Sequence, residues 1–356
     1  MSNFRIFKQV PRLLFGADSV DRLAELLPPK TSPEDYYVFV IDDVHKGGLI
    51  PPRLKATEND IIEYFPASKK EPSTAQVDEV RDKIVSLKGK QKPKSVIGLG
   101  GGSTMDVAKA VSVMLCNEGS SSQYQGWDLV PVPGLHKIGI PTVAGSGAEA
   151  SRTAVLMGKD RKFGINSDFS MFDAIILDSS LIKNVPTDQR FYSGMDCYIH
   201  CVESLQGTMI NELARGYASK ALDLCESVFL ADGDDDMLMT ASYLGGVSIV
   251  NSEVGVCHAL SYGLSLELGY RHGFANCVAF NVLDDYYGPW VDKFRQMLEI
   301  HKVTLPKNVT KSLDENAMKR MVEMTLRMER PLTNALGPDW KNILTPEKIV
   351  RLYEKM

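Results

Sequence analysis

The strand signals of this sequence are confined to its first half, and this asymmetry constrains the fold more than any other feature. Short β-branched and aromatic runs, such as residues 36–41, alternate there with helical patterns such as residues 74–88. Alternating strands and helices predict a parallel sheet covered by helices on both faces. After about Pro186, long apolar-periodic segments dominate. We therefore predict an α/β unit over residues 1–185 and an all-α unit over residues 186–356.

The expected elements follow from hydrophobic periodicity and from the turn residues that bound each run. In the first unit we expect strands over residues 36–41, 95–99, 137–142 and 174–178, and helices over residues 74–88 and 104–115. In the second unit we expect helical segments over residues 194–205, 211–230, 237–254 and 258–267.

Composition excludes several classes of protein. The 356 residues are enough for two domains with sizeable cores. A formal charge of −5 argues against nucleic acid as a partner, because binding it needs a basic face. No apolar run reaches about 18 residues, so no membrane partner is expected. The first residues lack the apolar region of a signal peptide, and the six cysteines form no CxxC pair. We therefore expect a cytoplasmic protein with reduced thiols.

A glycine-rich segment over residues 98–106 follows one expected strand and opens a helix. Glycines at this position let the backbone approach a pyrophosphate, and the free N–H groups of the helix point at it. Gly101, Gly102 and Ser103 are the candidate contacts. The alternative is a tight turn that binds nothing. The segment is not the GxGxxG fingerprint, so the predicted nucleotide site is Rossmann-like and not a standard Rossmann motif.

Two further segments follow strands and carry polar groups. Asp42 ends an early strand, where a carboxylate can accept hydrogen bonds from an adenosine ribose. A strand-end turn is the alternative for this residue. Residues 140–149 offer hydroxyls and small side chains that could line the other side of a cofactor.

Asp196 and His200 lie four residues apart in a helical segment, so their side chains share one face of the helix. His258 and His272, which follow later, could complete a metal site. One carboxylate with three imidazoles suits Fe²⁺ or Zn²⁺, and both ions accept this ligand set. For any one of these histidines alone, a hydrogen-bonded core or surface residue is the alternative.

Three segments together resemble those of the iron-containing (group III) alcohol dehydrogenases: residues 100–109, residues 141–149 and residues 194–200. His258 and the pair His272-Gly273 complete the resemblance, which extends over nearly the whole chain. It implies a Rossmann-like nucleotide domain followed by a helical metal-binding domain, an architecture shared with dehydroquinate synthase.

The resemblance also implies roles for individual residues. It implies that the divalent metal ligands are Asp196, His200, His258 and His272. It implies that the residues binding NAD(P) are Asp42 on the ribose side, Gly101, Gly102 and Ser103 at the pyrophosphate with Asp106 in the same segment, Thr142 and Ser146 on the nicotinamide side, and Lys162 near the nicotinamide ribose.

Within the family, the whole chain from residues 3–11 onward resembles bacterial enzymes that oxidise the C8 primary alcohol of the sugar acid 3-deoxy-D-manno-octulosonate (Kdo). That oxidation precedes an amination in 8-amino-Kdo and lipopolysaccharide sugar biosynthesis. The implied partners are a small sugar-acid substrate, a downstream aminotransferase dependent on pyridoxal phosphate, and a second copy of the chain. NAD⁺, NADP⁺ and dioxygen stay open as electron acceptors.

Two other functions share the architecture. One is NAD-dependent dehydrogenation of a simple alcohol, a diol or glycerol. The other is a lyase reaction like that of dehydroquinate synthase. The ligand pattern that we associate with that family is one glutamate and two histidines. The carboxylate here is an aspartate with three histidines, and this disfavours the lyase.

The sequence departs from the family at two positions. Tyr262 stands four residues after His258, where the family usually has a histidine that is thought to help carry the substrate proton. A tyrosine could replace it only as a hydroxyl relay, because its reference pKa is much higher. Tyr262 is therefore the candidate catalytic residue. Phe172 stands where a proline is common.

Overall fold

The computed structural model describes residues 6–67, 71–159 and 162–356. Residues 3–5 of the N-terminal resemblance lie outside the described residues. The chain forms two compact units, each described by itself. The first contains residues 9–143 and 148–185, and the second contains residues 186–356 together with residues 6–8 and 144–147. Within the described ranges, no helix is long and apolar enough to span a bilayer.

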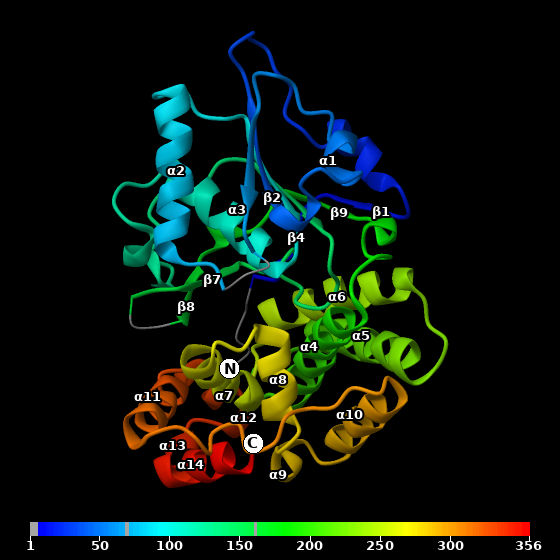
Figure 1. Cartoon of the computed structure of the whole chain (residues 1–356), viewed down its shortest axis with the longest axis vertical. Coiled ribbons are helices and arrows are strands. Elements are labelled where there is room, and N and C mark those ends of the chain that lie inside the picture. The colour runs from blue at the N-terminus through cyan, green and yellow to red at the C-terminus, as the bar shows by residue number, and fades with distance from the viewer. Residues whose placement is uncertain (1–5, 68–70, 160–161) are drawn as a thin grey trace. The chain divides into compact units, whose positions relative to one another are not determined.

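The first unit is built on a six-stranded parallel sheet in the order β1-β9-β6-β4-β2-β3 (Figure 1). Its strands are β1 (Leu13–Phe15), β2 (Tyr37–Asp42), β3 (Ile61–Phe65), β4 (Ser95–Gly100), β6 (Lys137–Pro141) and β9 (Ala174–Leu177). The sequence predicted β2, β4, β6 and β9, which are buried throughout. It missed the edge strands β1 and β3, which are short apolar runs with exposed or half-buried positions.

Both faces of this sheet are covered. One face buries a cluster that includes Phe39, Ile97 and Ile138 together with side chains of the 3₁₀ turn η1 (Ser19–Glu25). The other face packs against α3 (Gly102–Met114), which lies beside α2 (Thr74–Lys88). The parallel sheet with helices on both faces confirms the α/β prediction for this unit.

Close packing explains Phe172, which the sequence marked as unusual. Its ring is 1% exposed and lies over Gly139 of β6, where a Cβ atom would come within 2.9 Å of the ring. The aromatic ring thus fills the space that the missing side chain of Gly139 leaves.

A second, three-stranded sheet in the order β5-β8-β7 was not predicted. Its strands are β5 (Gly126–Trp127), β7 (Thr153–Met157) and β8 (Lys162–Asn166). β7 and β8 pair in antiparallel register. Half-buried side chains alternate along β7, so its periodic signal is weaker than that of the buried parallel strands.

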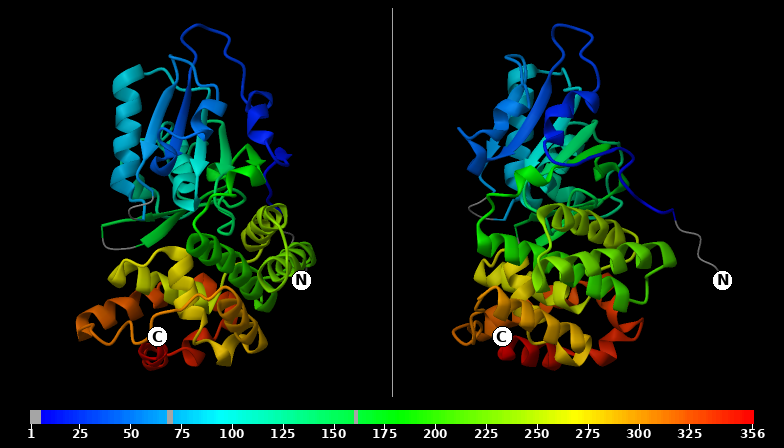
Figure 2. Two further views of the ribbon diagram at one scale, coloured as in Figure 1. Left: turned by 45° about the vertical axis from the view of Figure 1, so that its right-hand side comes forward. Right: turned by 90° about the vertical axis from the view of Figure 1, so that its right-hand side faces the viewer.

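The second unit is helical, as predicted, and its described residues contain no strand (Figure 2). Its longer helices are α4 (Thr187–Gln206), α5 (Glu212–Leu230), α6 (Asp235–Val250), α7 (Val256–Leu268), α8 (His272–Phe280), α10 (Pro289–Ile300), α11 (Glu315–Leu326), α12 (Glu329–Leu336) and α14 (Pro346–Lys355). Shorter helices are α1 (Ile50–Arg53) in the first unit and α9 (Asp284–Tyr287) and α13 (Trp340–Ile343) in the second. The helix expected over residues 237–254 is α6, which ends earlier than predicted, at Val250. A loop over residues 251–255 then leads into α7.

Candidate functional site

Three helices bring the four predicted metal ligands together. α4 carries Asp196 and His200 on one face, α7 carries His258, and α8 begins at His272. The Nε2 atoms of the three histidines lie 3.6, 3.4 and 3.5 Å from Oδ1 of Asp196, in chain order. All four candidate ligand atoms lie within 4.8 Å of one another. Side chains that are distant in the sequence thus converge on one point.

The electrostatics of this cluster favour a cation. Burial alone would lower the pKa of His258, but the carboxylates of Glu203 and Asp196 outweigh it and raise the pKa to about 9. Burial opposes ionisation of Asp196, yet the three histidines hold its pKa well below the usual range. A buried carboxylate that faces three imidazoles is the donor chemistry of a divalent Fe²⁺ or Zn²⁺ site. The residues present therefore fit such an ion.

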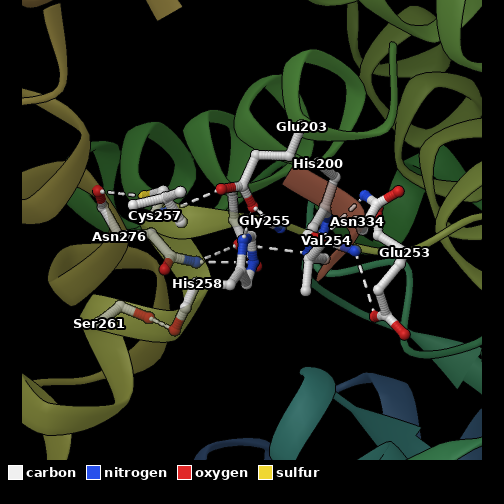
Figure 3. A network of polar contacts seen from close by, with 12 residues as sticks. His200, Glu203, Glu253, Val254, Gly255, Cys257, His258, Ser261, Asn276 and Asn334 are labelled. Carbon is white, nitrogen blue, oxygen red and sulfur yellow. Dashed lines mark hydrogen bonds and ion pairs between the residues drawn. The ribbon is translucent and has the colours of Figure 1, made fainter. Parts of the chain in front are cut away.

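Glu203 is a site residue that the sequence analysis missed. It lies on α4 one turn after His200, and Figure 3 shows its carboxylate directed at Gly255 and His258. His258 Nδ1 lies 2.5 Å from its Oε2 atom. The signal was present, because Asp196, His200 and Glu203 are spaced at i, i+4 and i+7 and so share one face of the helix.

Asn276 is a second residue that was missed. It is fully buried on α8, one turn after His272. Its Nδ2 atom donates a hydrogen bond of 2.6 Å to Asp196 Oδ1. The same nitrogen lies 3.1 Å from Nε2 of His258 and 3.3 Å from Nε2 of His272. The amide therefore orients the ligand carboxylate, and its i+4 spacing from His272 was the available signal.

The cysteines next to the ligands serve packing. The thiol of Cys197 donates to the backbone carbonyl of Ala241 at 3.2 Å, and that of Cys257 donates to the carbonyl of Asn276 at 3.3 Å. Both thiols are fully buried. Each cysteine lies one position from a ligand, so the helix turns its side chain by about 100° away from the ligand side chain.

Tyr262 lies on α7, one turn after His258. The centroid of its ring is 6.0 Å from that of His272, in an edge-on arrangement. His272 has the most exposed side chain of the four ligands, at 28%. The structure thus places Tyr262 on the more open side of the cluster, and its catalytic role stays a prediction.

In the first unit, the candidate nucleotide residues gather at the carboxyl ends of parallel strands. Asp42 ends β2 and Gly100 ends β4, and a Cβ atom on Gly100 would lie 2.8 Å from the Cβ of Asp42. The chain passes from β2 to β3 on one side and then returns to β4 on the other. Ligands of open α/β sheets bind at such a reversal of strand order. The glycine-rich segment lies beside this point.

Gly101 and Gly102 begin α3, and together with Ser103 they are half-buried while the rest of the helix is buried. A Cβ atom on Gly101 would meet only the side chain of Val143, at 3.6 Å. The N-terminus of α3 is therefore accessible, and its dipole and N–H groups suit an anionic group. This geometry is what a pyrophosphate requires.

The other predicted cofactor residues have protein partners. Thr142 Oγ1 lies 3.0 Å from His45 Nε2, and Lys162 Nζ lies 3.3 Å from a carboxylate oxygen of Glu71. Asp106 accepts a hydrogen bond of 2.9 Å from the backbone of Val155 and so joins α3 to β7. Burial raises the pKa of Asp106 to about 6. Their contacts with a cofactor stay predictions.

Ser146 belongs to a different unit from the other predicted cofactor residues. Residues 144–147 pack with the helical unit, and the N–H of Gly145 donates to Ser242 Oγ on α6 at 2.8 Å. A Cβ atom on Gly147 would come within 2.5 Å of Gly246 on the same helix. Its role toward a cofactor also stays a prediction.

Comparisons with known proteins agree with this geometry. Residues 11–179 match the family model described as iron-containing alcohol dehydrogenase, and residues 190–334 match the C-terminal domain of the Fe-containing alcohol dehydrogenase family. A sulfoacetaldehyde reductase of Bilophila wadsworthia is 32% identical over 263 residues, which cover 70% of this chain and 67% of the relative.

Two further similarities extend this result. A long-chain-alcohol dehydrogenase of Geobacillus thermodenitrificans is 31% identical over 56% of this chain, and the match spans about half the length of that relative, 53%. The crystal structure of sulfoacetaldehyde reductase from Bifidobacterium kashiwanohense in complex with NAD⁺ superposes with a TM-score of 0.78, over 98% of both chains and at 19% identity. At that identity the likeness concerns the fold.

Proposed function

Because the chain belongs to the iron-containing alcohol dehydrogenase family, we propose that it oxidises the C8 primary alcohol of Kdo to an aldehyde with a divalent metal and a nicotinamide cofactor. The observation that carries the proposal is the buried convergence of one carboxylate and three imidazoles on one point. Neither a packing role nor a solvated surface role accounts for four such donors together.

The proposed ligands are Asp196, His200, His258 and His272. Their burial keeps three of the four away from water, while the half-exposed His272 marks the side from which a substrate would enter. Asn276 holds the carboxylate of Asp196 through its amide N–H. When bound, the ion supplies Lewis acidity to the substrate hydroxyl, and the nicotinamide supplies the hydride acceptor.

The proposed nucleotide residues are Gly101, Gly102 and Ser103 at the pyrophosphate and Asp42 at the ribose. The accessible N-terminus of α3 and the reversal of strand order beside it support this assignment. In support of NAD⁺, the related structure from Bifidobacterium kashiwanohense is a complex with that cofactor. Asp106, Thr142, Ser146 and Lys162 complete the proposed set.

The proton that leaves the alcohol is assigned to Tyr262. Its position one turn after His258, with its ring centroid 6.0 Å from that of His272, supports a hydroxyl relay at the open side of the cluster. The phenol oxygen can accept one proton while it donates its own, so it passes a proton without holding a charge.

The substrate is the finer part of the proposal. The resemblance of the whole chain to Kdo-oxidising enzymes supports it. So does the Bilophila relative named for sulfoacetaldehyde, which is an anionic aldehyde, as the proposed product of Kdo oxidation is. A dehydrogenase of simple alcohols, diols or glycerol is the second candidate, and the long-chain-alcohol dehydrogenase among the relatives favours it. A homodimer, a pathway aminotransferase and a cytoplasmic location remain predictions.

The test loads the protein with Fe²⁺ or Zn²⁺ under anaerobic conditions and supplies Kdo with NAD⁺. We expect an aldehyde at C8, trapped as a hydrazone, with one NADH formed for each aldehyde. A parallel aerobic reaction that measures peroxide tests dioxygen as the acceptor. Turnover of 1,2-propanediol or glycerol without any aldehyde from Kdo would replace the sugar acid with a simple alcohol as substrate.

A further inference from the structure

We propose that Glu203 is a positioning residue that sets the metal affinity of the site by fixing one tautomer of His258 and the start of α7. The inference rests on the proposed role of His258 as a metal ligand. Glu203 lies on α4, is 1% exposed, and within the described residues forms a hydrogen bond to only one of the predicted ligands, His258. Its influence on a metal would therefore pass through the His258 ring.

The first step concerns the His258 ring. Its Nδ1 atom lies 2.5 Å from Glu203 Oε2, and a carboxylate can only accept, so the proton of the neutral ring must sit on Nδ1. The lone pair of Nε2 is then left on the side of Asp196. A carboxylate behind a histidine in this way orients the ring and increases its basicity as a ligand.

The second step concerns the start of α7. The N-cap residue Gly255 has no side chain that could cap the helix. The Glu203 carboxylate replaces one, because it accepts hydrogen bonds from the N–H groups of Gly255 at 2.8 Å and Cys257 at 2.6 Å. A buried negative charge at a helix N-terminus is favoured by the helix dipole. Ring and helix are thus positioned by the same carboxylate.

The third step concerns the loop over residues 251–255, which leads into α7. From α12, Asn334 Nδ2 donates to the carbonyls of Glu253 and Val254 at 3.0 Å each (Figure 3). Arg330 of the same helix pairs with the Glu253 carboxylate at 2.7 Å. Glu203 holds the N–H side of the same turn. The backbone that carries His258 is therefore fixed from two directions.

The buried carboxylate of Glu203 has partners at both oxygens. Its Oε2 accepts a hydrogen bond from the Gly255 N–H at 2.8 Å and lies 2.5 Å from His258 Nδ1. The Tyr287 hydroxyl donates to Oε1, on which the Cys257 N–H also converges. Both carboxylate oxygens are thus satisfied, which is the condition for a buried charge to persist.

The experiment measures the Zn²⁺ and Co²⁺ affinity of the full-length protein by competition with a chromophoric chelator. Glu203→Gln removes the charge behind His258 and is expected to weaken affinity about 10- to 100-fold. Glu267→Gln is the matched control, because that carboxylate lies at the far end of the same helix α7 and pairs with Arg320 at 2.6 Å. It should leave affinity within about twofold.

A pair of double variants separates positioning from general damage to the fold. We expect Glu203→Gln to weaken affinity as strongly in a His200→Ala background as in the wild-type chain, and to have little effect in a His258→Ala background, because its effect passes through that ring. Tyr287→Phe, which removes one partner of Glu203 and spares the His258 contact, should lower affinity by less than Glu203→Gln. Circular dichroism shows whether each variant folds.

The outcomes separate this inference from the proposed function. Equal losses in the His258→Ala and His200→Ala backgrounds would overturn the inference, because Glu203 would then act on the fold and not through His258. Unchanged affinity in Glu203→Gln, with affinity lost in His258→Ala, would also overturn it and leave the ligand set intact. Full affinity in His258→Ala would instead remove the proposed ligand. If Glu203→Gln does not fold, the metal affinity of Tyr287→Phe tests the inference instead. A smaller loss of affinity is expected in that variant, and an unchanged affinity would overturn the inference.

Discussion

At the scale of single residues, the proposed proton path beside the proposed metal ligands depends on Tyr262. Its ring centroid lies 6.0 Å from that of His272, the proposed ligand with the most exposed side chain, so a hydroxyl relay is proposed on that side. A tyrosine and a histidine differ in reference pKa by about three to four units, so a tyrosine relay passes protons without itself titrating near neutral pH.

Tyr262→Phe removes the hydroxyl and keeps the ring. We expect kcat to fall about 100-fold, with KM changed little, because proton transfer by a positioned side chain contributes that order of rate. Tyr262→His is the matched variant, and it should retain activity while adding a pH dependence near the reference pKa of histidine. Unchanged kcat in the phenylalanine variant would show that the proton leaves by another route.

Asp60 provides a residue-scale test of stability. It accepts hydrogen bonds from the N–H of Tyr37 at 2.7 Å and of Thr57 at 2.8 Å, and it pairs with Lys30 at 2.6 Å. Burial would raise the pKa of Asp60, but these partners outweigh it and lower the pKa. A carboxyl with a lowered pKa stabilises the fold above its unfolded pKa, and this stabilisation is lost as pH falls through the folded pKa.

Asp60→Asn should therefore lower the free energy of unfolding by about 1–3 kcal/mol at pH 7. The difference from the wild-type chain should shrink below about pH 4, where the carboxyl of the unfolded chain begins to take up a proton, and vanish once the native carboxyl is protonated at lower pH. Urea unfolding of both chains, followed by circular dichroism at pH 7 and at pH 3.5, measures it. A deficit that stays constant with pH would contradict the role of the charge.

Individual residues also show what the sequence reveals about a site. Asp196 and His200 were visible because helical spacing alone puts them on one face, whereas His258 and His272 needed either the resemblance or the fold. Glu203 and Asn276 follow the same spacing rule. A sequence does not show that these side chains are buried, and exposed glutamates and asparagines are common, so neither residue stands out before its partners are known. Their roles depend on contacts between helices, which no local pattern contains.

At the scale of elements, the nucleotide loop depends on how closely α3 approaches β4. A Cβ atom on Gly98 would lie 2.7 Å from Ala108 Cβ and 3.1 Å from the end of the Met105 side chain. The end of the Met105 side chain can move aside, but the contact with Ala108 Cβ cannot be accommodated unless the helix shifts. The absence of a side chain at Gly98 thus sets the position of the helix whose N-terminus is the proposed pyrophosphate site.

Gly98→Ala should accordingly cost about 1–3 kcal/mol of stability and weaken NAD⁺ binding, because the helix must shift. Gly216→Ala in α5 is the control. A Cβ atom there meets nothing within 4 Å, and alanine is the better helix former. We expect the control to be neutral or slightly stabilising. Calorimetric titration of NAD⁺ into both variants measures their affinity for the cofactor. Equal affinities in Gly98→Ala and Gly216→Ala would contradict the packing argument.

The predictable elements were those with a strong local signal. Strands β2 and β4 are buried throughout, and α2 carries a capping box at Ser73. β1 and β3 lie at the sheet edges, and β5 is only two residues long, so tertiary pairing defines them rather than periodicity. Tertiary contacts also explain why α6 ends early, at Val250. Residues 251–255 are held in a loop by hydrogen bonds with partners on α4 and α12.

At the scale of the whole molecule, the two units contain the proposed binding residues for different ligands. The proposed metal ligands all belong to the helical unit, whereas Asp42 and the glycine-rich segment belong to the α/β unit. A ligand that binds only the folded state stabilises the unit that holds it, by about 2.7 kcal/mol at a hundredfold excess over Kd. Each ligand should therefore protect its own unit from unfolding.

Removal of metal by a chelator should increase amide hydrogen exchange in α4, α7 and α8 and leave β2 and β4 unchanged. NAD⁺ should protect the start of α3 instead. Hydrogen exchange followed by mass spectrometry measures both effects on one sample. Equal changes in both units on removal of metal would contradict a metal site confined to the helical unit.

The metal content of the His258→Ala variant tests the central claim most directly. After anaerobic loading with Fe²⁺ or Zn²⁺ and gel filtration, elemental analysis of the wild-type chain should find roughly one ion per chain. The account predicts that His258→Ala retains little metal and oxidises no alcohol while its circular dichroism spectrum is unchanged. Full metal content in that variant would contradict the assignment of Asp196, His200, His258 and His272 as the ligand set.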